Sequence, residues 1–284
     1  MVRPKSSMPP VVPIRTARQR VIAISGGKGG VGKSTLSVNL ACTFASMGSR
    51  TLVFDGDLGM ADLNLLFGVA PELTLLDLLT GGDPDEILIE THGIHLLPAL
   101  NGSYALANLE EGVRNKLIRA VAQLAMNFET LVVDTAAGIH QNNMALTAMA
   151  SEVLVVATPE PLSLADAYAC LKVLAKDLGK DRIFLVPNNV RSQDEARAVV
   201  AQLDKLARRF LGVELIPLPH IPHDPMVPVA AAEGVPLAIS RPDSPACRAV
   251  KRVARELDAI ALREAPGPTA RDRLQALAAG AELV

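Results

Sequence analysis

Short apolar stretches alternate along the chain with longer segments whose apolar residues recur every three or four positions. Helical spacing of this kind is clear in Lys33–Met47 and Ala196–Phe210. Stretches that are apolar at successive positions predict strands covered on both faces, and helices between them predict parallel pairing. We therefore expect an α/β fold, a three-layer and mostly parallel sheet with helices on both faces. The expected strands are Val21–Ser25, Thr51–Asp55, Ile94–Pro98, Thr130–Asp134, Val153–Thr158, Arg182–Pro187 and Glu214–Pro219.

The 284 residues divide into three parts. Residues 1–19 are rich in proline, basic and without periodicity, so we expect a flexible tail. Residues 20–262 carry the alternation without an internal linker and predict one domain. Ala265–Pro268 interrupts the last helical segment. Residues 263–284 are therefore expected to form a C-terminal appendage with a weakly amphipathic helix.

Composition excludes several classes of protein. Hydrophobic residues make up 49% of the chain and charged residues 20%, which predicts a large buried core. A net charge of −2 and an aromatic content of 3% argue against a chain built mainly to coat nucleic acid. No apolar run approaches the roughly 20 residues that cross a bilayer. Three widely spaced cysteines fit a reducing cytoplasm and argue against a disulfide framework or a local cysteine-based metal site.

The strongest chemical signal is the glycine-rich stretch Ser25–Thr35, which contains the phosphate-binding pattern G-x-x-x-x-G-K-[ST]. Glycines let such a loop wrap so that backbone N–H groups point at phosphate oxygens, and the following helix N-terminus adds partial positive charge. Lys33 is expected to reach the β- and γ-phosphates, and the Ser34 hydroxyl to ligate Mg²⁺. The residues expected around the nucleotide phosphates are Gly27, Gly29, Gly30, Val31, Gly32, Lys33, Ser34 and Thr35.

Two polar residues follow other expected strands. Asp134 ends an apolar strand, where a carboxylate holds Mg²⁺ through water in phosphate-binding loop enzymes. Asn188 follows another strand, and its amide can donate and accept hydrogen bonds together, which suits the edge of adenine. The N-K-x-D pattern of a guanine reader is absent from the sequence. These positions favour an adenine nucleotide.

Lys28 is a second lysine within the glycine-rich loop, and residues 28–34 read KGGVGKS. This motif resembles the deviant Walker A ATPases of the MinD/ParA family, and the resemblance covers about residues 20–262. It implies a P-loop fold of the SIMIBI/MinD type that binds ATP or ADP with Mg²⁺. It also implies an ATPase that is slow alone and stimulated by a partner. The active form would be a homodimer formed with ATP, in which Lys28 crosses to the nucleotide of the other copy.

The resemblance also assigns roles to acidic residues. Asp57 would orient the attacking water, so that Lys28, Lys33 and Asp57 form the catalytic set. Asp55, Asp134 and Ser34 would make up the Mg²⁺ site.

The base would lie between two loops in such a protein. Asn188 aligns with the adenine-contacting asparagine of the family, and residues 221–225 (IPHDP) resemble its second base loop. Pro222 would pack on the ring, and the backbone near Asp224 would contact it.

Several stretches look closer to the flagellum-number regulators (FlhG/FleN/YlxH) than to MinD proper. This branch implies an ATP-driven switch that sets flagellar number, flagellar placement or cell-pole position, with an FlhF-type GTPase and flagellar C-ring proteins as partners. The DQAxxLR motif that stimulates the GTPase is not evident in residues 1–20. The stretches that carry the resemblance are Asp57–Asn64, Leu75–Gly82, Asp134–Ile139, Asn188–Ala196 and Pro242–Ala249.

The sequence leaves open whether the protein binds a membrane or DNA. The appendage would give reversible membrane contact, which places the protein in the cytoplasm and peripherally at the inner face of the cell membrane. A ParA-like partition ATPase that binds DNA without sequence specificity is the alternative function, supported by a basic helical stripe. A solvated helix face explains the same stripe. Its residues are Arg248, Lys251, Arg252 and Arg255.

Overall fold

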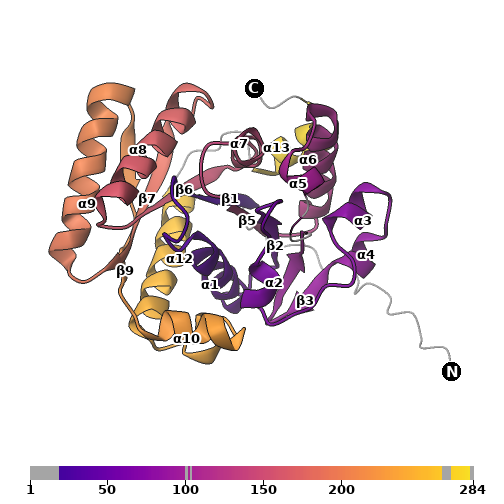
Figure 1. The fold of residues 1–284 in the computed structure, drawn as a ribbon, viewed down its shortest axis with the longest axis horizontal. Helices are drawn as coiled ribbons and strands as arrows, with labels where there is room; N and C mark the ends of the chain where they lie inside the picture. Colours follow the sequence, from indigo (N-terminus) through magenta and orange to yellow (C-terminus); the bar gives the residue numbers. More distant parts are fainter. Residues whose placement is uncertain (1–18, 100–101, 103, 264–269, 282–284) are drawn as a thin grey trace.

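The computed structural model describes residues 19–99, 102, 104–263 and 270–281 (Figure 1). Within them a nine-stranded sheet has the order β3-β4-β2-β5-β1-β6-β7-β8, and β9 pairs with β7. Its neighbouring strands are parallel except β3 and β4. The mostly parallel sheet expected from the apolar pattern is thus confirmed. The strands are β1 (Arg20–Ser25), β2 (Thr51–Gly56), β3 (Ile89–Thr91), β4 (Ile94–Leu97), β5 (Thr130–Thr135), β6 (Glu152–Ala157), β7 (Arg182–Val190), β8 (Glu214–Pro217) and β9 (Ile221–Pro222).

Helices cover both faces of the sheet. On one face α1 and α12 pack over Ile22 and Ile24, and on the other α6, α7, α8, α9 and α13 pack over Val21 and Ala23. Successive residues of β1 therefore point into opposite halves of the core, which is why this strand is apolar at every position. The helices are α1 (Lys33–Ser46), α2 (Leu63–Leu66), α3 (Leu75–Leu79), α4 (Pro84–Ile87), α5 (Tyr104–Ala107), α6 (Glu111–Ala125), α7 (Gln141–Ala148), α8 (Pro161–Lys176), α9 (Gln193–Leu206), the π-helix η1 (Ala207–Leu211), α10 (Met226–Glu233), α11 (Leu237–Ser240), α12 (Pro245–Arg263) and α13 (Ala270–Ala278).

Two elements depart from the periodicity. β3 is a three-residue edge strand that pairs antiparallel with β4 through a turn at His92 and Gly93, both with positive φ. It is too short for a pattern to reveal it. The helix expected over 196–210 begins earlier, at Gln193 behind the cap Ser192, and its last turn is the π-helix η1.

The two ends of the chain meet the domain at α6. Gln19 is buried, and its side-chain amide donates to the carbonyl oxygens of Ala125 and Phe128 at 2.7 and 2.8 Å. The rest of the expected tail, residues 1–18, lies outside the described residues. Helix α13 packs against α6, and its Leu274 and Leu277 are buried in the core. None of the helices in the described part of the chain combines the length and hydropathy that crossing a membrane requires.

Candidate nucleotide-binding site

The glycine-rich loop connects the carboxyl end of β1 to the first turn of α1. Gly30 and Gly32 have φ of 79° and 96°, a region that residues with a Cβ avoid. Gly27 lies so close to α8 that a Cβ there would overlap the Asp166 carbonyl, whereas Gly29 has open space around it. Backbone geometry of this kind forms the concave nest of N–H groups that binds phosphate.

Lys33 is buried at the base of this loop. Its ammonium group donates to the Lys28 carbonyl oxygen at 3.2 Å, across the loop. Burial lowers the pKa of Lys33, while the nearby Asp134 and Asp57 carboxylates oppose that shift. A buried cation flanked by carboxylates is positioned to neutralise phosphate oxygens.

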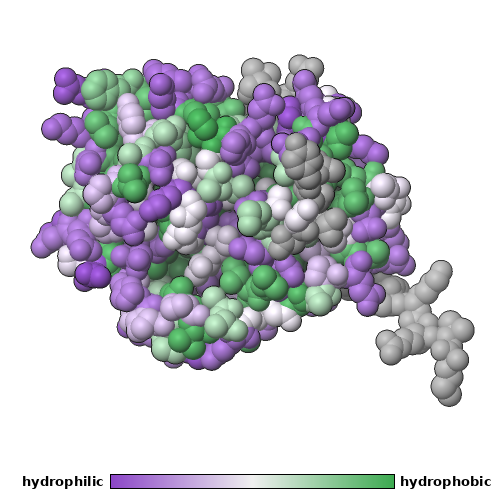
Figure 2. Space-filling view, viewed as in Figure 1, coloured by the Kyte–Doolittle hydropathy of each residue, from purple (hydrophilic) through white to green (hydrophobic). Residues whose placement is uncertain are grey.

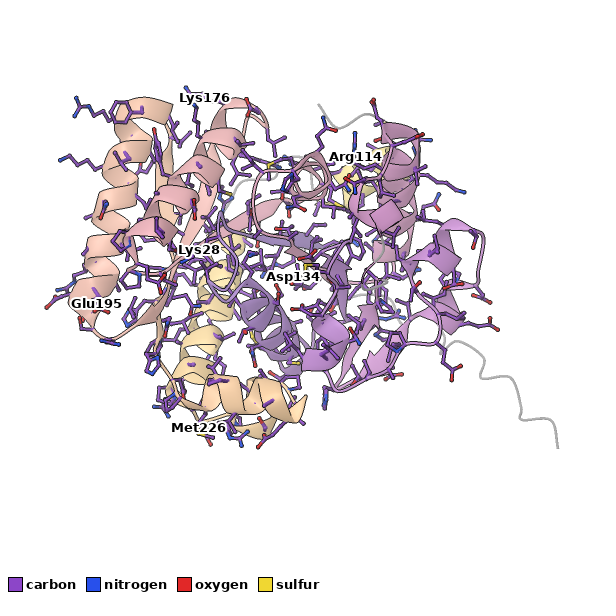
Figure 3. All side chains as sticks on the ribbon, viewed as in Figure 1. Lys28, Arg114, Asp134, Lys176, Glu195 and Met226 are labelled. Atoms are coloured by element: carbon purple, nitrogen blue, oxygen red, sulfur yellow. The ribbon has the colours of Figure 1, made fainter. Side chains whose placement is uncertain are left out.

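Asp134 is the second-to-last residue of β5 and lies beside the start of α1, near the middle of the molecule (Figure 3). It is fully buried, and Ser37 Oγ donates to its Oδ1 at 2.7 Å. Burial raises the pKa of Asp134 to about 6, although hydrogen bonds from Ser34 and Ser37 and the charge of Lys33 lower it. The predicted partners Ser34 and Asp134 therefore lie together.

Asp55 lies next to Asp134 because the two residues are partners in the parallel register of β2 and β5. Its carboxylate accepts hydrogen bonds from the backbone N–H groups of Asp57 at 3.2 Å and Leu63 at 3.0 Å. Burial and then the charge of Asp134 raise the pKa of Asp55 to about 8. Asp55 thus holds the segment that carries Asp57 in place. It lies at the site beside Asp134, its partner in the register of β2 and β5.

This acidic pair fits a divalent cation. Two adjacent buried carboxyls with raised pKa values are stabilised by a cation, and carboxylate and hydroxyl oxygens are the ligands that Mg²⁺ prefers. In the described residues no cluster of three or more His, Cys, Asp or Glu side chains could hold a metal ion alone. A cation here would therefore share its ligands among Ser34, Asp134, water and phosphate, with Asp55 behind them.

The two segments that follow β2 and β5 differ in how they are held. Asp57 is half-buried, and its Oδ1 accepts from the Met60 backbone N–H at 3.1 Å. Gly138, with φ of 89°, donates its backbone N–H to the Gly26 carbonyl at 3.4 Å. The amide of Asn143 reaches the carbonyl oxygens of residues 136–138 at 3.2 to 3.5 Å. The segment after β5 thus touches the loop that would hold the phosphates, and Asp57 lies near enough to Lys33 for its charge to act on it.

Lys28 points away from its own loop. Its ammonium group forms an ion pair with Glu160, with Nζ 2.9 Å from Oε2, on the α8 side of the site (Figure 3). Both side chains are partly exposed, so the pair contributes little stability, about 1 kcal/mol or less. Of the two loop lysines, one is therefore buried under the loop and the other lies at the surface.

A pocket of about 300 Å³ lies beside the loop, between β7, the β9 turn and α12. Asn188 lines it, and its side-chain N–H donates to the Val31 carbonyl at 2.7 Å, which leaves the Asn188 Oδ1 as an acceptor. Pro222 also lines this pocket. Asp224 is turned to the backbone, because its carboxylate accepts from the N–H groups of Met226 and Ala246, each at 3.0 Å. The pocket is of a size and polarity that suit a purine.

The structure brings Lys33, Asp55, Asp134 and Asn188 to one edge of the sheet, where β1, β2, β5 and β7 end, whereas Lys28 points away from the loop and the Asp224 carboxylate is bound to backbone N–H groups. Sequence analysis missed Ser37, Asn143 and Glu160, which hold Asp134, the 136–138 segment and Lys28 in place. It also missed Asp62, whose pKa is raised by burial and by Asp57. Of these residues, only Ser37 could have been found from the sequence, because it lies one helical turn after Lys33 and therefore on the same face of the expected helix.

Comparisons with known proteins give a consistent result. Residues 22–237 match the CobQ/CobB/MinD/ParA nucleotide binding domain. The antiactivator FleN of Pseudomonas aeruginosa is 38% identical over 249 residues, 87% of this chain and 89% of FleN. The flagellum site-determining protein YlxH of Helicobacter pylori is 37% identical over 68% of this chain and 66% of YlxH. The septum site-determining protein MinD of Pyrococcus horikoshii, solved in complex with Mg-ADP, superposes with a TM-score of 0.69 at 27% identity, covering 86% of this chain and 97% of MinD.

Proposed function

The chain belongs to the CobQ/CobB/MinD/ParA nucleotide-binding family, and from this premise we propose that it is a switch ATPase whose two copies pair around ATP. ATP and ADP with Mg²⁺ are its nucleotide ligands, in line with the Mg-ADP complex of the MinD from Pyrococcus horikoshii. In this proposal the site binds ATP, two copies close on each other, and hydrolysis to ADP and phosphate opens the pair.

The observation that carries the proposal is the different placement of the two loop lysines, one buried under the loop and one at the surface. Lys33 Nζ lies under the loop, where it neutralises the phosphates of its own nucleotide. Lys28 Nζ lies at the surface, paired with Glu160 and turned away from the loop of its own chain. A cation placed outside its own site beside a phosphate loop is available to a second copy.

Exposed apolar residues follow three of the site residues in the sequence. Met60 follows Asp57, Ile139 follows Gly138, and Leu162 lies two residues beyond Glu160, with exposed fractions of 74, 51 and 68%. Most of the surface seen in Figure 2 is polar with small hydrophobic areas. Apolar side chains around a catalytic edge are typical of a surface that becomes buried in a complex.

The chemistry needs positioning and charge neutralisation more than a covalent nucleophile. Lys33 and the loop N–H groups hold the β- and γ-phosphates, and the Asp57 carboxylate orients the attacking water. Mg²⁺, when bound, draws charge from the β- and γ-phosphate oxygens, and Ser34 and Asp134 are the residues that would hold it. Asn188 and Pro222 bind the adenine. Turnover is slow in the isolated protein and faster with a partner, because the partner completes the geometry.

We infer a role in flagellar number, flagellar placement or cell-pole position from the similarity to FleN and YlxH. An FlhF-type GTPase and proteins of the flagellar C-ring are the partners that this role implies. The protein acts in the cytoplasm, with reversible contact at the inner face of the cell membrane. Contact through α13 would require this helix to leave α6, because its Leu274 and Leu277 are buried there.

One observation favours the alternative of a ParA-like ATPase that binds DNA. Arg252 and Arg255 on α12 are exposed and make no ion pair with any described residue, whereas Arg248 and Lys251 donate to backbone carbonyls. A gel shift of nonspecific duplex that needs ATP, weakens with salt and disappears in Arg252→Glu would support DNA binding. The absence of a shift with ATP would exclude it.

Titration calorimetry with Mg-ADP tests the assigned phosphate site. Lys33→Ala should weaken binding by roughly a hundredfold, because it removes about 3 kcal/mol of charge-assisted hydrogen bonding. Lys172→Ala, an exposed lysine of α8, is the matched control and should leave binding unchanged. Unchanged affinity in Lys33→Ala would contradict the assignment.

A further inference from the structure

Two adjacent asparagines in the first turn of α7 are buried although both are polar. Asn142 is 9% exposed and Asn143 is 4% exposed. A buried amide is normally hydrogen-bonded, so each side chain is expected to hold a nearby polar group in place. Because successive residues of a helix point about 100° apart, the two amides can reach different segments of the chain.

Asn143 holds the segment that follows β5. Its side-chain amide nitrogen lies 3.2 Å from the carbonyl oxygens of both Ala136 and Ala137, and 3.5 Å from that of Gly138. Gly138 in turn donates its backbone N–H to the Gly26 carbonyl of the phosphate loop at 3.4 Å. Asn143 therefore sets how this segment lies against the loop.

Asn142 holds α5 instead. Its side-chain N–H groups donate to the carbonyl oxygens of Ala107 at 3.0 Å and Leu106 at 3.3 Å. Helices α5 and α7 are thus neighbours in the layer that also contains α6 (Figure 1). The last carbonyl groups of a helix need donors from outside that helix, so the Asn142 amide fixes the end of α5.

Helix α5 lies against the segment that follows β2. A Cβ placed at Gly59 would lie 3.1 Å from the Ala107 Cβ, so the two segments approach closely there. Gly102, shortly before α5, donates its backbone N–H to the Gly59 carbonyl at 3.1 Å. Gly59 is two residues after Asp57, and the residue after Gly59 donates its N–H to the Asp57 carboxylate. A chain of contacts therefore runs from α7 through α5 to Asp57.

We propose that Asn142 and Asn143 are positioning residues that link the Asp57 segment to the Gly138 segment, so that both move against the γ-phosphate as one unit. This inference rests on the proposed ATPase function and adds how its two segments are coupled. Because both amides lie in one turn of one helix, a shift of either segment displaces the other. The pair acts on the rate of hydrolysis and not on nucleotide affinity.

Single-turnover hydrolysis of ATP with Mg²⁺ tests the effect on the rate. Asn142→Ala and Asn143→Ala should each slow phosphate release by about tenfold or more, while the Kd for ADP stays within about threefold of the wild type. The double variant should be at most about threefold slower than the slower single variant, because either change breaks the same link. Asn143→Asp keeps the size of the side chain without its N–H donors, and it should behave as Asn143→Ala does.

Two other variants of α7 separate this role from a loss of stability. Thr147→Val removes the hydrogen bond from the Thr147 hydroxyl to the Asn143 carbonyl, at 2.7 Å within the helix, and Gln141→Ala changes an exposed residue of the first turn. Both should release phosphate within about threefold of the wild-type rate. The thermal midpoint is measured for every variant. Rates that fall in step with the midpoint, these two variants included, would overturn the proposal.

Hydrogen exchange of the nucleotide-free protein measures the coupling without turnover. Peptides that cover residues 57–63 should exchange at least about threefold faster in Asn143→Ala, although the donors of this side chain are directed at residues 136–138. Faster exchange at residues 136–138 alone would overturn the proposal, as would effects of the two single variants on hydrolysis that multiply in the double variant. A wild-type protein that hydrolyses no ATP would contradict the proposed function, and the exchange result would still decide the coupling.

Discussion

Asp55 and Asp134 stand side by side at the ends of β2 and β5, as direct partners in the parallel register. Both carboxyls are buried, and the pKa of Asp55 is raised to about 8 and that of Asp134 to about 6. An ordinary aspartate has a pKa near 3.9 in an unfolded chain. Without a cation, this pair therefore holds protons that the unfolded chain releases.

The pair predicts that the nucleotide-free protein loses stability as the pH rises. The folded chain binds more protons than the unfolded chain, so this contribution is present at low pH. It is lost through about pH 6 for Asp134 and about pH 8 for Asp55. The slope is up to about 1.4 kcal/mol per pH unit for each carboxyl. Urea unfolding from about pH 5 to pH 8 measures it, and Asp55→Asn should have a shallower slope. An equal slope would contradict the raised pKa of Asp55.

Gly27 and Gly29 offer a matched test of the loop geometry. A Cβ at Gly27 would overlap the Asp166 carbonyl of α8, whereas a Cβ at Gly29 meets nothing within 4 Å. Gly27→Ala should therefore lower the thermal midpoint, by about 2–4 °C for each kcal/mol of strain, and displace the loop. Gly29→Ala should keep the wild-type midpoint. Equal midpoints in the two variants would mean that the loop does not lie against α8.

Asn188 predicts a preference for adenine. Its N–H is engaged by the Val31 carbonyl, so its Oδ1 can accept from the adenine amino group but repels the carbonyl oxygen of guanine. Calorimetry should show ADP binding at least about tenfold tighter than GDP. Asn188→Ala should bring the two affinities together. Asn127→Ala, which changes an exposed asparagine outside this pocket, is the control and should keep the preference.

Asp57 is expected to act on water and not on nucleotide affinity. Its carboxylate is held by the Met60 N–H above the site, and Lys33 remains to bind the phosphates. Asp57→Ala should slow single-turnover phosphate release by about 10²- to 10⁴-fold while the Kd for ATP stays within about threefold. Release at the wild-type rate would remove Asp57 from the mechanism.

Sequence reasoning reached the layers of the fold because β1, β5 and β6 are apolar at successive positions and the helices between them are periodic. It placed Asp55 and Asp134 correctly at strand ends, since parallel strands deliver their carboxyl ends to one edge of the sheet. Both the order of strands and helices and the residues at strand ends can be predicted from the local sequence pattern.

Contacts between distant segments could not be predicted in this way. Lys28 and Glu160 are 132 residues apart, and Glu160 looks like an ordinary residue before a helix. Asn143 lies within α7, where an amide carries no signal until the 136–138 segment folds back over it. Helix α13 is buried because it packs against α6, which is distant in the sequence. Its short apolar pattern alone therefore could not be distinguished from that of a helix at the surface.

The central claim is that Lys28 serves the nucleotide of a second copy. The mass of the particle in solution tests it most directly, measured by light scattering for the wild type and Lys28→Ala with a non-hydrolysable ATP analogue and Mg²⁺, or with ADP. We predict two chains for the wild type with the analogue and one with ADP. Lys28→Ala should remain a single chain in both cases, with its affinity for ADP within about threefold of the wild type. A Lys28→Ala protein that pairs as the wild type does would contradict the claim.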